Sequence, residues 1–123
     1  MTKEERRYYT DLIKGRLSKK RFEHSVNVSK QAVHLAKLYG ADEHKAELAG
    51  LLHDVMKEEK GEVQLKYIKA RMRKPADIML AVPKIWHGFA AAGYLKKELH
   101  IKDKEILDAV AYHSTGRENM TLL

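Results

Sequence analysis

The sequence predicts an all-α protein, a single helical bundle formed by residues 1–123. Apolar side chains recur at intervals of three and four residues through most of the chain, whereas the strict alternation typical of strands is scarce. The only two prolines, Pro75 and Pro83, fall between the periodic segments, where they interrupt no helix. A chain of 123 residues is also long enough to bury a hydrophobic core as one domain.

Three helices are expected in the first half of the chain, and they cover residues 3–17, 19–39 and 43–55. Ser18 and Asp42 precede the second and third of these, and their side-chain oxygens can accept the unpaired N–H groups of a first turn. Gly40 ends the second helix, because glycine tolerates the left-handed backbone conformation of a helix C-terminus. The third helix is expected to fray near Lys57.

The second half contains shorter elements. They are a charged loop at 58–61, a more exposed helix at 62–72, a short turn of helix after Pro75, a helical segment at 83–99 and a last helix from Lys102 to 113–116. The small residues 90–93 indicate that the segment carrying them packs closely against another helix. No internal repeat or second domain is evident.

Composition narrows the classes of function. The absence of cysteine excludes disulfides, a thiolate metal site and a cysteine nucleophile, and it suits a cytoplasmic location. No apolar run approaches the roughly 20 residues of a membrane span, so no membrane partner is expected. The net charge of +7 favours an anionic partner. Aromatic residues are not interleaved with the basic clusters as in a single-strand binding groove, so nucleic acid is not the expected partner.

The histidines divide into two groups by their neighbours. Those with polar neighbours are expected at the surface, and they are His34, His44 and His100. Those with apolar neighbours are His24, which shares a face with Val28, Ala32 and Leu35, together with His53, His87 and His113. One such histidine is more often a hydrogen-bonded core residue than a ligand. Four of them on four helices, with Asp54 beside His53, favour a metal site instead.

A divalent cation accounts for this set because it is the partner that imidazole nitrogen and carboxylate oxygen share. Without one, burial of the carboxylate and of several imidazoles is costly. The absence of thiolates fits iron, manganese, cobalt or zinc, which could make hydroxide available near neutral pH. Lys57, Arg21 and Arg117 lie near the motif histidines in sequence, as phosphate clamps would. The alternative to a metal site is a helical interaction domain in which the four histidines are core residues.

Five stretches around these residues carry a more specific signal. They are R-F-E-H-S at 21–25, L-Y-G-A-D at 38–42, K-A-E-L-A-G-L-L-H-D at 45–54, W-H-G at 86–88 and Y-H-S-T-G-R at 112–117. The doublet His53-Asp54 resembles the one for which the HD-domain metal-dependent phosphohydrolases are named. Together the stretches are similar to the bacterial YqeK family of symmetrical bis(5'-nucleosyl)-tetraphosphatases, all-α HD-domain enzymes that split diadenosine tetraphosphate into two ADP.

The resemblance implies the composition of the metal site. Iron would be held by His24, His53 and Asp54, with manganese, cobalt or zinc as alternatives, and by an Asp from a further helix. His87 and His113 would line the adjacent polyphosphate site or bind a second ion.

The resemblance also implies roles in hydrolysis of a nucleotide substrate. Asp54 would hold or orient the attacking water, and Lys57 and His113 would stabilise charge or protonate the departing nucleotide. Substrate contacts are expected from Arg21, Asp54, His87, His113 and Arg117. The alternatives are an HD hydrolase of another nucleotide phosphoester, or a nucleotide-binding or RNA-binding module without turnover.

The family continues beyond the position of Leu123 into a helix that carries its last metal-binding Asp. We therefore expect an incomplete HD domain, either a fragment or a short relative, whose fourth protein ligand would lie beyond Leu123. The apolar faces left exposed could be covered by a second copy in a homodimer.

Overall fold

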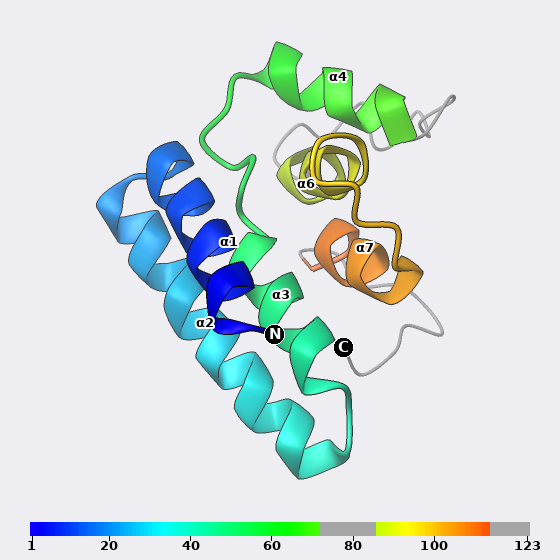
Figure 1. Ribbon diagram of the computed structural model, residues 1–123. Helices are drawn as coiled ribbons and strands as arrows, with labels where there is room; N and C mark the ends of the chain where they lie inside the picture. The colour runs from blue at the N-terminus through cyan, green and yellow to red at the C-terminus, as the bar shows by residue number, and fades with distance from the viewer. Residues whose placement is uncertain (72–85, 114–123) are drawn as a thin grey trace.

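The computed structural model describes residues 1–71 and 86–113, which form six helices and no strand. The helices are α1 (Lys3–Arg16), α2 (Lys19–Tyr39), α3 (Glu43–Leu52), α4 (Gly61–Arg71), α6 (Trp86–Lys97) and α7 (Lys104–Ala111). In Figure 1, α1 and α2 lie on one side of α3, and α6 and α7 lie on the other, with α4 packed on α6. The predicted all-α bundle is confirmed. None of the helices in these two ranges has the length and apolar character needed to cross a membrane.

The predicted caps of α2 and α3 are present. The Ser18 hydroxyl accepts the backbone N–H of Arg21, and the Asp42 carboxylate accepts that of Lys45 at 3.0 Å. Gly40 has a φ of 72°, the left-handed conformation that ends a helix. Leu17 is the C-cap of α1 and not its last residue.

The third helix is shorter than predicted. It ends at Leu52, and the chain then turns tightly, since the N–H of Val55 donates to the Leu52 carbonyl and that of Lys57 donates to the Asp54 carbonyl at 2.9 Å. These bonds span three residues and not four, so they tighten the backbone beyond a regular α-helix. The buried Gln64 side chain holds the following loop by donating to two of its carbonyls. The prediction of helix through Val55 was therefore wrong.

Close packing of α4 on α6 is confirmed. A methyl group at Gly93 would collide with the backbone carbonyl of Tyr67, so the two helices approach nearer than any larger residue allows. Tyr67 and Ile68 are buried in this contact, and α4 begins at Gly61, one residue before the predicted start. Arg71 is its last described residue.

The last helix begins later than predicted. Asp103 caps α7 by accepting the N–H groups of Glu105 and Ile106, so Lys102 lies before the helix. Tyr112 is its C-cap. The predicted end at 113–116 was wrong, because α7 ends at Ala111. The turn after Pro75 and the start of the segment 83–99 fall outside the described residues.

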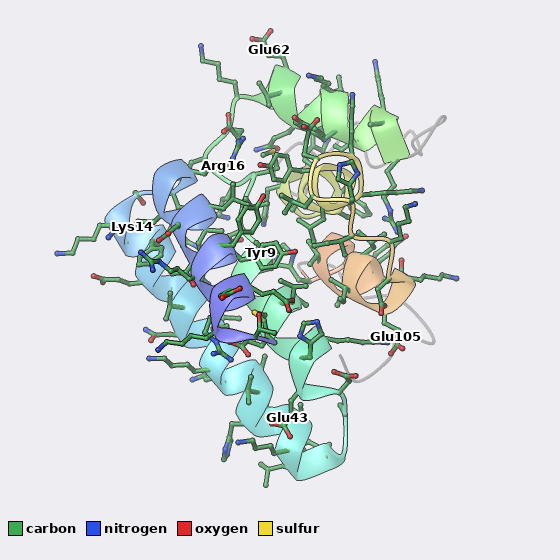
Figure 2. The ribbon with its side chains drawn as sticks, in the orientation of Figure 1. Tyr9, Lys14, Arg16, Glu43, Glu62 and Glu105 are labelled. Atoms are coloured by element: carbon green, nitrogen blue, oxygen red, sulfur yellow. The ribbon has the colours of Figure 1, made fainter. Side chains whose placement is uncertain are left out.

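The core lies between the helices and excludes most charged groups. In Figure 2, Lys14, Glu43, Glu62 and Glu105 extend outward from the bundle, whereas Tyr9 on α1 packs against the core. The fully buried large side chains are Ile13, Leu52, Val55, Met56, Ile68, Leu95 and Val110.

The buried face of α2 differs from the sequence prediction. Leu35, expected beside His24 on an inward face, is 53% exposed. The buried positions are the small residues Ser25, Ser29 and Ala36, because α3 packs at this face through Gly50, where an added methyl group would come within 2.9 Å of the Ser29 Cα. Small side chains therefore set the α2–α3 contact.

Candidate metal centre

Asp54 lies at the centre of the candidate site. It follows directly after the end of α3, and the apolar run of that helix carries it inward so that its side chain is only 3% exposed. Side chains from α2, α6 and the end of α7 surround it. The two carboxylate oxygens have different neighbours.

The Oδ2 side is formed by the N-terminal half of the chain. The Arg21 guanidinium donates to Oδ2 from Nη1 at 2.9 Å. The Nε2 atoms of His53 and His24 lie 3.4 and 3.8 Å from the same oxygen. The His24 side chain is 46% exposed, so this side opens to solvent at α2.

The Oδ1 side is formed by the C-terminal half. The Nε2 atoms of His87, in the first turn of α6, and His113, just after α7, each lie 3.7 Å from Oδ1. The two Nε2 atoms are 3.1 Å apart. Gly88 permits this approach, because a methyl group there would come within 2.8 Å of the Ala111 carbonyl and 3.1 Å of the His113 ring.

Backbone carbonyls fix the tautomer of two imidazoles. His53 Nδ1 lies 2.6 Å from the Gly50 carbonyl, and His113 Nδ1 lies 2.7 Å from the Val110 carbonyl. A carbonyl oxygen only accepts, so each Nδ1 must carry the proton and donate it. In the neutral rings, Nε2 then turns a lone pair toward Asp54. Lone pairs that face a carboxylate require a cation or a proton between them, and this donor arrangement fits a metal ion.

Burial controls the protonation of the His53–Asp54 doublet. Desolvation lowers the pKa of His53 below its usual value, outweighing the opposite effects of the Asp54 charge and the Gly50 carbonyl. Burial acts to raise the pKa of Asp54, but the charge of His53 and the hydrogen bond from Arg21 outweigh it, and that pKa is lowered. The doublet therefore favours a neutral imidazole beside an ionised carboxylate, the states that bind a metal ion.

Two groups of three residues could hold an ion. One is His24, His53 and Asp54, and the other is Asp54, His87 and His113; in each, the candidate ligand atoms lie within 4.8 Å of one another. Asp54 belongs to both. The structure thus brings together the residues predicted for the metal and for the adjacent site.

Two predicted phosphate-binding residues are less defined. Lys57 is exposed one turn after Asp54, and its ammonium forms no ion pair within residues 1–71 and 86–113. Arg117 lies outside the described residues. The predicted surface positions of His34, His44 and His100 are confirmed, since all three are exposed.

Sequence reasoning missed contacts that support the site, although it named Arg21 as a site residue. The contact between Arg21 and Asp54 spans 33 positions, so spacing could not suggest it. The roles of Gly50 and Gly88 carried a weak signal: each lies within three residues of a candidate histidine, where close backbone approach is the usual reason for glycine.

Comparison with known proteins gives consistent matches. The family model for the HD domain matches residues 21–123. The chain is 40% identical over 111 residues to the symmetrical bis(5'-nucleosyl)-tetraphosphatase of Bacillus subtilis, covering 90% of this chain and 59% of the relative. It is 39% identical over 113 residues to the protein of that name from Halalkalibacterium halodurans, covering 91% and 59%.

A solved structure also matches the fold of this chain. A crystal structure from Clostridium acetobutylicum, described as a predicted HD superfamily hydrolase involved in NAD metabolism, superposes with a TM-score of 0.87 at 36% identity, covering 94% of this chain and 61% of the other. This chain thus spans about 59% of the length of the curated relatives. The HD domain implies a bound divalent metal ion, and the two groups around Asp54 could hold one.

Proposed function

Because the chain belongs to the HD-domain family, we propose that it is a metal-dependent phosphohydrolase that cleaves symmetrical dinucleoside polyphosphates, with diadenosine tetraphosphate and water giving two ADP. The observation that carries the proposal is the buried Asp54 carboxylate with imidazoles from both halves of the chain around it. The names of the relatives supply the substrate.

In this proposal His24, His53 and Asp54 hold the metal ion, and the family resemblance favours iron over manganese, cobalt or zinc. The chemistry that a divalent ion supplies is activation of water near neutral pH and neutralisation of phosphate charge. The residues fit because His53 turns an unprotonated Nε2 toward an ionised carboxylate. A second ion beside His87 and His113 is a variant of the same proposal.

The surrounding residues would position the substrate and manage the proton. Asp54 orients the attacking water toward one phosphorus of the bridge, and the bond from that phosphorus to the oxygen of the departing ADP breaks. His113 or Lys57 supplies a proton or positive charge to that oxygen. His87, Arg21 and Arg117 contact the phosphate oxygens, for which a guanidinium is well suited because it donates two parallel hydrogen bonds.

Product analysis tests this function. We expect the chain, loaded with iron or manganese, to convert diadenosine tetraphosphate to ADP alone, with oxygen from water in one of the two ADP molecules. His34→Ala, an exposed histidine away from the cluster, should leave the rate unchanged. Release of ATP plus AMP, or binding without turnover in loaded protein, would contradict the proposal and favour another phosphoester or a binding module.

A further inference from the structure

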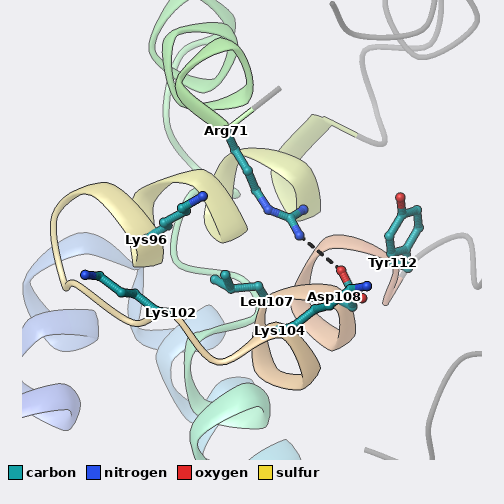
Figure 3. A pocket seen from close by; sticks show the side chains of 7 residues that line it. All are labelled: Arg71, Lys96, Lys102, Lys104, Leu107, Asp108 and Tyr112. Carbon is teal, nitrogen blue, oxygen red and sulfur yellow. Dashed lines mark hydrogen bonds and ion pairs between the residues drawn. The ribbon is translucent and has the colours of Figure 1, made fainter. Parts of the chain in front are cut away.

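A second site candidate lies where α4, α6 and α7 meet. A pocket of about 460 Å³ is lined there by four cationic side chains, Arg71, Lys96, Lys102 and Lys104. Figure 3 shows them around Leu107 and Asp108, with Arg71 reaching Asp108 and the side chains of Lys102 and Lys104 extending toward opposite sides of the pocket. None of the residues that line the pocket belongs to the groups around Asp54.

The pocket holds more positive charge than its own carboxylate balances. Arg71 donates to Asp108 at 3.0 Å, and both side chains are largely buried, so this pair is internally neutralised and fixed in place. The ammonium groups of Lys96, Lys102 and Lys104 form no ion pair with any carboxylate of residues 1–71 and 86–113. Among the described residues, three positive charges at the pocket therefore have no paired carboxylate.

The two acidic residues beside Lys104 have another partner. Asp103 and Glu105 flank Lys104, and either could neutralise a neighbouring lysine. Both instead pair with Lys45 on α3, each at 3.0 Å. Asp103 and Glu105 are thus held by a cation from a helix that does not line the pocket, and within the described residues no carboxylate pairs with the three lysines.

The shape and charge favour a small ligand with linked phosphates. The volume lies in the range of small-molecule sites, roughly 300–1,000 Å³. Three ammonium groups from separate segments match several phosphate oxygens better than a single carboxylate, because each ammonium brings three donors and no acceptor. We propose that this pocket binds a small molecule that carries two or more linked phosphate groups, either inorganic polyphosphate or a nucleoside polyphosphate.

The pocket and the metal centre use opposite faces of one helix. Lys104 and Asp108 share a face of α7 at a spacing of four residues, whereas Ile106 and Val110 lie on the buried face that leads to His113. The proposed anion site can therefore be occupied independently of the metal centre. The proposal of this anion site does not depend on the proposed hydrolase function.

Binding of inorganic tripolyphosphate to the full chain tests the proposal, with metal removed by chelation. Lys96→Glu with Lys102→Glu should weaken binding about tenfold or more, as expected for loss of two charge-assisted contacts. The matched control, Lys3→Glu with Lys97→Glu, changes the net charge equally at exposed positions outside the pocket and should stay within about twofold.

Titration of the wild type, followed by amide NMR, gives a readout independent of any variant. Tripolyphosphate should shift the amide signals of Lys96, Lys102 and Lys104 first. ATP binding more tightly than tripolyphosphate would support a nucleotide as the ligand, and equal binding would support inorganic polyphosphate.

Two results would overturn the proposal. They are unchanged tripolyphosphate binding in Lys96→Glu with Lys102→Glu, and amide shifts confined to the residues around Asp54. Tighter binding of single-stranded RNA than of tripolyphosphate at the same lysines would also overturn it, in favour of a nucleic-acid surface.

Discussion

The two oxygens of Asp54 face different surroundings. Oδ2 receives the Arg21 guanidinium at 2.9 Å and lies beside imidazoles of the N-terminal half, whereas Oδ1 lies 3.7 Å from each of two imidazoles of the C-terminal half. One side already contains a permanent positive charge, and the other contains two titratable rings only 3.1 Å apart. A single buried carboxylate therefore connects two half-sites, and we predict metal binding on the Oδ2 side and substrate chemistry on the Oδ1 side.

Removal of the shared carboxylate should have the largest effect. Asp54→Ala takes a candidate ligand from both half-sites, and we expect hydrolysis to fall about a thousandfold or more. Initial rates at saturating metal and substrate measure this. A loss of rate of less than tenfold would contradict this prediction, because it would mean that neither half-site depends on Asp54.

Metal affinity should separate the two half-sites next. His53→Ala should weaken Mn²⁺ binding about a hundredfold, because it removes a proposed ligand, whereas His87→Ala should change it by less than about threefold while lowering the rate. Calorimetric titration of each variant makes the comparison. Equal weakening by both substitutions would indicate one four-imidazole site, or two ions.

The positive charge of Arg21 on the Oδ2 side should contribute most to stability when no metal is bound. Arg21→Gln leaves the buried carboxylate less compensated, and we expect the metal-free protein to lose about 1–2 kcal/mol of stability. Mn²⁺ should recover part of this loss, since it supplies positive charge at the same carboxylate. Denaturant unfolding measures both, with the exposed Arg7→Gln as the matched control. A loss that Mn²⁺ leaves untouched would separate Arg21 from the metal centre.

Acidification should produce the smallest effect. The folded pKa of His53 lies below 6.5, so the unfolded chain binds a proton that the folded chain resists, and stability falls as the pH drops below about 6.5. The folded pKa of Asp54 is also lowered, so its contribution is lost only below about 3.8. Between pH 7 and 5 the metal-free protein should lose about 1 kcal/mol. His53→Gln should flatten this slope, whereas His34→Gln should not.

The sequence predicted features that depend on local chemistry. Ser18, Gly40 and Asp42 mark helix ends because capping involves residues three or four positions apart. The end of α3 was not predictable in this way. It depends on turns after Leu52 and on the distant side chain of Gln64.

Prediction of the candidate site shows the same difference between features set by neighbouring residues and features set by helix packing. The apolar neighbours of His53, His87 and His113 were enough to select these histidines, and the structure places them around Asp54. The contact of Arg21 with that carboxylate, and the closeness of α6 to α7 at Gly88, depend on how the helices pack. The catalytic and binding roles of these residues stay predictions.

The hydrogen bonds from His53 and His113 to backbone carbonyls bear on the proton balance of ion uptake. Both rings keep a proton on Nδ1, so each offers Nε2 to an ion. Burial lowers the pKa of His53, so its Nε2 carries no proton near neutral pH. Loading should therefore release little acid from His53, and this ring should contribute little to any dependence of the heat of loading on the ionisation enthalpy of the buffer.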